Sequence, residues 1–488
     1  MQNRPARRLR AILLTAAAAS AAAVTTTAWS PAAHADPGPS VVVRAGGHDP
    51  QVPFLVAREG EAMVSFTARA PGVDWGVTGH ESAVVSASVD GTYVTDVVIP
   101  SDQSIPREFF LGHLHRGLHR LTFHLATDRT RGGDLAVLRG ISFRTVTPGS
   151  ADYAVYAHAP VLYGRTLAQW GGPFQNAFTD VPLIAWHEVT PQPDGSLELR
   201  YTIVWSNEDG GTGLAPASLM ARWGRTTDIE WIYHVGVYQL RLDPDGNVVP
   251  GSEIYQAPQH GSIPFAGKYE DHHPILQTCT DNNNVCDQLD ADAQAHPMRF
   301  TLSISQALPT GQAREVMMDR NGWTYWVTAR EMQREGKIEA TPDTNTPDLS
   351  DERNYLYLVL KKTTTGPSDN TKSPWVGAGV AVKLKGSDTL YRSDHAQLGW
   401  TVQRDDPAAT TVELPPGTKS ADIEQIYVFR APNSATDNGD SIQVQRIDRA
   451  MFLDQNYRPE PYFIQNYTTP AVTLTAAQPA AVVWTNQA

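Results

Sequence analysis

The chain has 488 residues, of which 19% are charged, a formal net charge of −13 and two cysteines. An acidic surface repels phosphate backbones and anionic membranes, so the charge argues against nucleic acid or lipid as a partner and favours neutral or cationic ones. The G-x-S-x-G, H-E-x-x-H, P-loop and dinucleotide-binding patterns are absent, which excludes the protein classes defined by those motifs.

Residues 1–35 predict a secretion signal peptide. Four arginines precede an alanine-rich apolar run, and Ala33-His34-Ala35 supplies a small-x-small cleavage site. The apolar run is shorter than the roughly 20 residues that a bilayer requires, so we expect no membrane span and a secreted, extracellular mature protein. Arg7-Arg8 leaves both the general and the twin-arginine export routes open. Without these 35 residues the formal net charge becomes −17.

Residues 36–150 predict an antiparallel β-sandwich that serves as an accessory module. Short segments in which apolar and polar residues alternate are separated by glycine, proline and Asp-Gly turns, a pattern typical of such sandwiches. Asp90-Gly91 lies between two of these segments and is a strong signal for a two-residue hairpin. The segments are SVVVR, AMVSFTA, TYVTDVVI and LHRLTFHL.

Residues 111–126, LGHLHRGLHRLTFHLA, contain Leu-Gly, a short turn and then Gly-x-His-x-Leu. This stretch resembles the penultimate strand of jelly-roll accessory modules in secreted bacterial enzymes. The resemblance covers these residues alone, and it implies a jelly-roll-like topology for the N-terminal module.

Residues 151–488 predict a larger β-rich domain, or a pair of β-sandwich domains with a boundary near 340–375. Strands are expected in SLELRYTIVWS, DIEWIYHVGVYQLRL and MRFTLSIS, with a hairpin turn at 243–247. One helix is expected from Thr324 to Glu335, where good helix formers are followed by Gly336 as the terminating glycine. Its apolar residues follow helical spacing only in part, so we expect it to pack at the surface.

A six-residue motif occurs twice in this region. DIEWIY at 228–233 is matched by DIEQIY at 422–427. If the match reflects an internal duplication, the two copies are equivalent strands of two packed sheets or of two sandwich domains.

The stretch ARWGRTTDIEWIY, residues 221–233, supplies the first candidate site. On a strand, Asp228 and Glu230 share one face, about 6.6 Å apart, while the apolar side chains occupy the other face. Glycoside hydrolysis uses two carboxyl groups about 5 to 9.5 Å apart, so this spacing suits a catalytic pair. The alternative is that both carboxylates only solvate the exposed face of a strand, because Asp422 and Glu424 repeat the pattern without a tryptophan between them.

The loop WSNEDGGTG, residues 205–213, supplies two further candidate catalytic carboxylates, Glu208 and Asp209. Loops at strand ends often carry function, although Asn-Glu-Asp-Gly-Gly is also ordinary turn chemistry. Sugar-binding sites combine carboxylates with aromatic rings that stack on the sugar. The candidate substrate-binding residues near these carboxylates are Trp205, Arg222, Trp223, Arg225 and Trp231.

The stretch CTDNNNVC, residues 279–286, predicts a disulfide between Cys279 and Cys286, because an exported protein keeps disulfides in an oxidising environment. The bridge would hold the TDNNN turn in one shape. The C-x6-C spacing does not match a zinc site.

The same region offers metal ligands. Asp281, Asn283 and Asp287 provide the oxygen atoms that calcium prefers, without matching an EF-hand. His272 and His273 provide nitrogen atoms, but adjacent residues on a strand point to opposite faces, so one histidine at most serves a given site. Calcium is therefore the one cofactor that the sequence suggests, and a polar loop without metal is the alternative.

Three functions remain open from the sequence. The first is a secreted carbohydrate-active enzyme, a glycoside hydrolase that uses paired carboxylates on an extracellular polysaccharide. The second is a non-catalytic protein that binds polysaccharide or cell wall through the same aromatic residues. The third is a metal-dependent hydrolase centred on His272 or His273. The sequence leaves the oligomeric state open.

Overall fold

A computed structural model describes most of the chain after the predicted signal peptide. The predicted signal peptide, Asp209 and the predicted turn at 243–247 lie outside the described residues. Strands make up 49% and helices 10% of the structure, which confirms a mainly β protein built from antiparallel sheets. The described residues are 38–166, 177–208, 215–242, 248–289, 298–343, 346–366 and 374–487.

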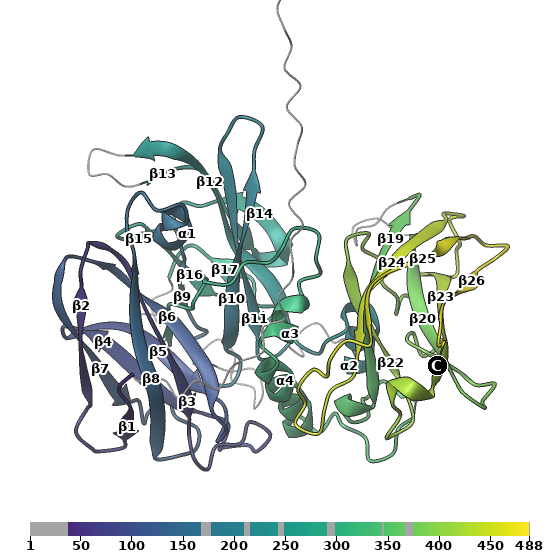
Figure 1. Cartoon of the computed structure of the whole chain (residues 1–488), viewed down its shortest axis with the longest axis horizontal. Coiled ribbons are helices and arrows are strands. Elements are labelled where there is room, and N and C mark those ends of the chain that lie inside the picture. Colours follow the sequence, from purple (N-terminus) through teal and green to yellow (C-terminus); the bar gives the residue numbers. More distant parts are fainter. Residues whose placement is uncertain are drawn as a thin grey trace, which may run out of the picture. The chain divides into compact units, whose positions relative to one another are not determined.

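The first eight strands form two four-stranded sheets around one apolar core, as predicted (Figure 1). Successive side chains of a strand point to opposite faces of its sheet, so one face can line the core. In β2, every second residue is buried and the others are exposed. Asp90 and Gly91 both have positive φ, as the predicted tight hairpin between β4 and β5 requires. In spatial order, the first sheet is β1 (Val41–Arg44), β8 (Leu135–Val146), β3 (Gly60–Arg69) and β6 (Ile105–Leu114), and the second is β2 (Gln51–Val56), β7 (Gly117–Leu125), β4 (Ala83–Val89) and β5 (Thr92–Ile99).

The next two sheets carry the residues of the candidate site. The larger one is a five-stranded antiparallel sheet of β10 (Pro182–Pro191), β11 (Leu197–Trp205), β12 (Ile229–Leu242), β13 (Val248–Ala257) and β14 (Gly261–Pro264). The smaller one consists of β15 (Tyr269–Glu270), β16 (His273–Thr278), β9 (Val161–Tyr163) and β18 (Arg299–Phe300), with β17 (Val285–Cys286) paired to β16. Strands β16 and β9 run parallel. Both sheets contribute to one large apolar core.

Two further four-stranded sheets enclose a separate apolar core near the C-terminus. The repeated motif begins β12 in one copy and β23 in the other, and Asp422 lies on the surface just before β23. The first sheet is β22 (Ala408–Glu413), β19 (Tyr355–Thr364), β24 (Ile442–Met451) and β25 (Ile464–Leu474), and the second is β21 (Leu390–Arg392), β20 (Val376–Leu384), β23 (Ile423–Pro432) and β26 (Ala480–Thr485).

Helices are few among the described residues, and none of those described is long and apolar enough to cross a membrane. The domain boundaries near 150 and 340–375 stay predictions. The α-helices are α1 (Tyr153–Ala157), α2 (Pro216–Trp223), α3 (Val316–Arg320) and α4 (Trp323–Arg334), and the 3-10 turns are η2 (Pro258–His260), η3 (Glu352–Asn354) and η4 (Ser420–Asp422).

Helix α4 matches the predicted helix in position but not in environment. Gly336 ends it with φ of 71°, and the amides of Gly336 and Lys337 donate to the carbonyls of Gln333 and Met332, which is a Schellman motif. The expectation of a surface helix was wrong, because nine of its side chains are buried. The buried face includes Glu331 and Arg334, which form an ion pair with each other. Helical hydrophobic periodicity is weak because part of the buried face is charged.

A buried carboxylate connects the N-terminal sandwich to β16. Glu61 of β3 accepts hydrogen bonds at 3.1 Å from His113 of β6 and from His273 of β16. Burial raises the pKa of Glu61, but the two histidines outweigh burial and bring this pKa down to about 2. The Glu61 hydrogen bond also raises the pKa of His113 to about 9. Glu61 and His113 are therefore charged at neutral pH.

We expect the Glu61→Gln variant to lose about 3 kcal/mol of stability at mildly acidic pH, because it removes the buried carboxylate that His113 and the buried His273 share. Stabilisation by Glu61 is present above its ordinary pKa of 4.5 and is lost as pH falls towards 2. Stabilisation by His113 is present below its ordinary pKa of 6.5 and is lost as pH rises towards 9. The difference in unfolding midpoint between parent and variant should peak between these ordinary values.

The matched control is Glu59→Gln, because Glu59 contacts His113 from an exposed position. We expect little change in that variant. A Glu61→Gln effect of the same size in strong acid, at mildly acidic pH and in alkali would contradict the ion-pair explanation.

Candidate functional site

Helix α2 and the turn after it lead the chain into β12. Thr410 and Thr411 of β22 donate to the carbonyls of Ala221 and Met220, so the last turn of the helix is satisfied by side chains from a distant strand. Gly224 then takes φ of 67°, and a Cβ at this position would lie 2.6 Å from that of Ala409. Glycine is therefore required where the helix turns towards β12.

Asp228 is buried, contrary to the expectation of an exposed strand face. Only 3% of its surface is exposed, and the Asn283 amide donates to its Oδ2 at 3.1 Å. Asn283 belongs to the disulfide loop, which covers the face that the sequence pattern left open. A register shift between β11 and β12 next to Trp231 also breaks simple alternation, so that Ile232 and Tyr233 are both buried.

Asp228 and Glu230 lie close together, and each carboxyl group affects the pKa of the other. Burial, followed by the nearby charge of Glu230, raises the pKa of Asp228 to about 7, against the opposing effects of Arg225, Asn283 and Arg314. Burial also raises the pKa of Glu230, whose side chain is 14% exposed. The two groups titrate together and retain a shared proton near neutral pH.

Arginines lie beside this carboxyl pair. The Arg314 Nη1 donates to the Ile229 carbonyl at 2.6 Å, and Arg225 Nη1 lies 2.5 Å from Glu315 Oε1. Arg225 and Arg314 both lower the pKa of Asp228, but burial outweighs them. The pair therefore remains protonated in part although two guanidinium groups are close.

His260 lies beside the partly exposed side of the pair. Its side chain is 52% exposed, and its Nδ1 is 3.7 Å from Glu230 Oε1. The amide nitrogens of Gln256 and Asn282 lie 3.1 Å from its Nδ1 and Nε2. Gln259 and His260 have φ of 61° and 58°, a conformation that non-glycine residues rarely adopt in succession. Such backbone strain concentrates at functional sites.

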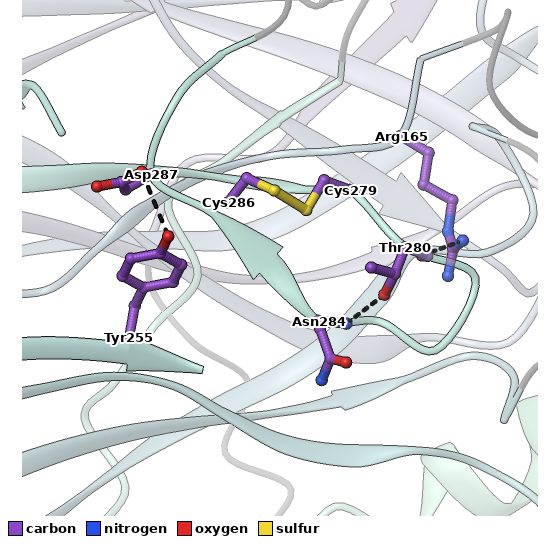
Figure 2. Close-up of a disulfide and its surroundings, with 7 residues drawn as sticks. All are labelled: Arg165, Tyr255, Cys279, Thr280, Asn284, Cys286 and Asp287. Atoms are coloured by element: carbon purple, nitrogen blue, oxygen red, sulfur yellow. Dashed lines mark hydrogen bonds between the residues drawn. A yellow bond between two sulfur atoms is a disulfide. The ribbon is translucent and has the colours of Figure 1, made fainter. Parts of the chain in front are cut away.

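The predicted disulfide is confirmed, with Cys279 and Cys286 joined across the TDNNN turn (Figure 2). Arg165 holds this turn from the inside: its guanidinium donates at 2.6 Å to the Thr280 carbonyl and to Asn283 Oδ1. The same guanidinium forms a fully buried ion pair with Asp180 at 2.8 Å. The disulfide and Arg165 together fix Asn283 against Asp228.

The predicted calcium site is not assembled. Asn283 directs its side chain to Arg165 and Asp228. Asp287 accepts a hydrogen bond from the Ala266 amide and another from Tyr255 (Figure 2). The Asp281 carbonyl accepts from Arg165 at 3.2 Å. Within the described part of the chain, no group of three or more His, Cys, Asp or Glu residues is arranged to hold a metal ion.

His272 and His273 lie in different environments, as predicted for adjacent residues of a strand, but they do not form a metal site. His273 is buried and bonded to Glu61 and to the Ala159 carbonyl, while His272 is half-buried. Both nitrogens of His273 are therefore occupied by protein partners. A metal-dependent reaction centred on these histidines has no ligand set among the described residues.

The aromatic and arginine candidates separate into core and surface groups. Trp205 is 0% exposed and belongs to the apolar core, so its ring is closed to a sugar. Trp223 and Trp231 are half-buried and remain candidates. The guanidinium of Arg222 lies 4.8 Å from the Trp223 ring centroid. Glu208 is buried at the end of β11, where its amide donates to the Thr226 carbonyl, two residues before Asp228.

Sequence reasoning missed His260, Gln256 and Arg314, which surround the carboxyl pair. None of them lies in a motif, and each is separated from Glu230 by more than twenty residues. The sequence around Gln259 and His260 does not indicate that both residues adopt positive φ. Antiparallel pairing of β12 with β13, and then of β13 with β14, brings this segment to the site.

No protein-family model and no curated protein matches this chain. Among solved structures, the C-terminal domain of EclA, described as a sugar-binding protein, is 10% identical with a TM-score of 0.18, over 24% of this chain and 90% of that one. A ruminal GH26 endo-beta-1,4-mannanase is 15% identical with a TM-score of 0.16, over 27% and 28% of the two chains.

The M60 catalytic domain with two CBM51 domains of ZmpB from Clostridium perfringens is 10% identical with a TM-score of 0.15, over 82% of this chain and 32% of that one. This chain thus spans about a third or less of the mannanase and ZmpB chains. At such low TM-scores these similarities establish no common overall fold. The functional proposal therefore depends on the geometry of the site.

Proposed function

We propose that this protein is a secreted carbohydrate-active hydrolase in which the Asp228–Glu230 pair donates the proton to the leaving oxygen of a glycosidic bond. The observation that carries the proposal is the burial of Asp228 beside a second carboxyl group, that of Glu230, which together raise the pKa of Asp228 to about 7. A carboxyl group that keeps its proton near neutral pH is suited to general acid catalysis.

The pair supplies one catalytic function rather than two. Asp228 and Glu230 are neighbours that act on one another's pKa, whereas the acid and nucleophile of a glycosidase lie about 5 Å or more apart on either side of the scissile bond. A second carboxylate is needed on the other side of the sugar. Glu208 is the candidate, because its backbone is paired with that of Thr226 beside Asp228.

His260 connects the pair with solvent. The Nδ1 atom of His260 lies 3.7 Å from Glu230 Oε1, a distance within ion-pair range but too long for a direct hydrogen bond. The half-exposed imidazole can pass a proton between the pair and solvent. Trp223 and Trp231 are the rings available for stacking on sugars.

The test incubates the mature protein with neutral, acidic and sulfated polysaccharides of plants, fungi and bacteria, and measures released reducing ends. We expect the parent to release sugar from at least one polymer. The Glu208→Gln/Glu230→Gln double variant should release none, since it removes the second carboxylate and half of the acid pair. Circular dichroism and the unfolding midpoint establish that both proteins are folded.

A non-catalytic polysaccharide-binding protein is the alternative, and the same panel separates it from the hydrolase. Binding to one polymer without release of reducing ends by the parent would overturn the hydrolase proposal. Equal release by parent and double variant would place the chemistry outside this site.

A further inference from the structure

Asn283 is the residue of the disulfide loop that contacts the carboxyl pair. It is 0% exposed, and its backbone takes φ of 53°, a left-handed conformation that asparagine adopts more readily than most residues. The loop is closed by the Cys279–Cys286 disulfide, and the Cys279 amide donates to the Asn284 carbonyl at 3.1 Å (Figure 2). The backbone on both sides of Asn283 is therefore held in place.

The hydrogen bonds of Asn283 fix the orientation of its amide group. Arg165 donates to its Oδ1 at 2.6 Å, and its Nδ2 lies 3.1 Å from Asp228 Oδ2 and 3.3 Å from the Asn207 carbonyl oxygen. The opposite orientation would place Oδ1 against that carbonyl and the NH2 group against the guanidinium of Arg165, so acceptor would face acceptor and donor would face donor. Asn283 is therefore a hydrogen-bond donor to Asp228.

This orientation decides which oxygen of Asp228 can hold a proton. A proton on Oδ2 would point at the NH2 group of Asn283, which donates hydrogen bonds and does not accept them. When Asp228 is neutral, its proton must therefore lie on Oδ1, while Oδ2 accepts from Asn283. The proton of the acid leaves from one defined oxygen.

Asn283 differs in kind from the other groups that act on Asp228. Burial is the main cause of the raised pKa of Asp228, and the hydrogen bond from Asn283 opposes it. Because Asn283 is neutral, its removal changes this pKa without changing the formal charge of the site. The titratable or charged groups that interact with Asp228 are Glu230, Asp180, Arg225 and Arg314.

We propose that Asn283 is a positioning residue of the hydrolase, which holds Asp228 so that its proton is presented on Oδ1. Arg165 and the Cys279–Cys286 disulfide act through Asn283, because they keep its amide in place. The inference rests on the proposed function for the reaction itself, whereas the effect of Asn283 on the protonation of Asp228 is measurable without a substrate.

The test compares the pH–activity profile of Asn283→Gly with that of the parent, since glycine keeps the left-handed backbone and removes the amide. The alkaline fall in activity should move up by about one pH unit, because a hydrogen bond to a carboxylate is stronger than one to a neutral carboxyl group. Asn283→Asp should move it further, since a second carboxylate opposes ionisation of Asp228. If Asn283 only filled space, the aspartate, which has the same shape, would be the milder substitution.

Unfolding midpoints test the same hydrogen bond without a substrate. The stability that protonated Asp228 confers decreases from its ordinary pKa of 3.8 up to its pKa in the folded state, which is about 7 in the parent. In Asn283→Gly this decrease should continue to higher pH, so the variant should lose more stability relative to the parent in mild alkali than in mild acid.

The matched control is Asn466→Gly, because Asn466 also has positive φ, of 49°, but lies exposed on β25. Its difference from the parent should be the same at all pH values. The Cys279→Ser/Cys286→Ser variant opens the loop and should shift the pH profile in the same direction as Asn283→Gly. Combined with Asn283→Gly, it should add little further shift, since both changes remove one contact.

The two proposals fail in different ways. A parental pH profile in Asn283→Gly, together with a stability loss that is equal in acid and alkali, would overturn the positioning role and leave the hydrolase standing. A smaller shift in Asn283→Asp than in Asn283→Gly would also overturn it. Absence of sugar release by the parent, with the pH-dependent stability loss present, would overturn the hydrolase and leave the effect of Asn283 on Asp228 standing.

Discussion

The Asp228→Asn variant is expected to lose roughly 10²- to 10³-fold in kcat on the polysaccharide that the parent cleaves, since an amide cannot donate the proton of a carboxyl group. The substitution keeps size and shape, and the Asn283 amide can still donate to the remaining oxygen. The loss should therefore appear in kcat with little change in KM. Steady-state kinetics at several pH values measures both.

A second expectation concerns how activity and stability change with pH. In the parent, activity should fall as pH rises through about 7, because the pair then loses its shared proton. The raised pKa also means that the native state binds this proton more tightly than the unfolded state. Stability should therefore decrease from the ordinary pKa of 3.8 to about 7, and the variant should lack that decrease. The variant should unfold at a higher temperature than the parent in mild alkali.

Asp422→Asn is the matched control, because Asp422 occupies the same position in the second copy of the motif but is exposed. It should keep parental activity and its pH profile. Unchanged kcat in Asp228→Asn would show that the buried pair is structural, and a lower unfolding temperature of that variant in alkali would contradict the raised pKa.

The Arg165→Ala variant is expected to lose about 3 to 5 kcal/mol of stability, because it leaves the carboxylate of Asp180 buried without its counterion. Both side chains are fully buried, and their nitrogen and oxygen atoms lie 2.8 Å apart. Burial raises the pKa of Asp180 to about 6 even with Arg165 present. In the variant, Asp180 can take up a proton, so the destabilisation should be smaller in acid than in alkali.

Arg165→Ala should also release the disulfide loop, since Arg165 holds Thr280 and Asn283 in place. Hydrogen exchange at residues 279–286 measures this effect, and denaturant unfolding measures the stability. The control is Arg353→Ala, whose ion pair with Asp351 is partly exposed and should contribute at most about 1 kcal/mol. Equal effects of the two variants would indicate that the Arg165 pair contributes no more than a surface contact.

Local features were predictable from the sequence because each depends on residues close together in the chain. Alternation predicted the strands of the N-terminal sandwich, and Asp90-Gly91 predicted its hairpin. Gly336 marked the end of α4, since left-handed backbone favours glycine. The short spacing of Cys279 and Cys286 in an exported protein predicted the disulfide.

The environment of the candidate site was decided by tertiary structure. Asp228 appeared exposed because the pattern of one strand does not report what covers it, and here the cover is Asn283, far along the chain. Helix α4 appeared peripheral because its inward face contains Glu331, which is satisfied by Trp75 at 2.5 Å. Hydrophobic periodicity identifies buried residues only when they are apolar. A polar side chain is buried wherever distant partners satisfy its hydrogen bonds, and only the folded chain supplies those partners.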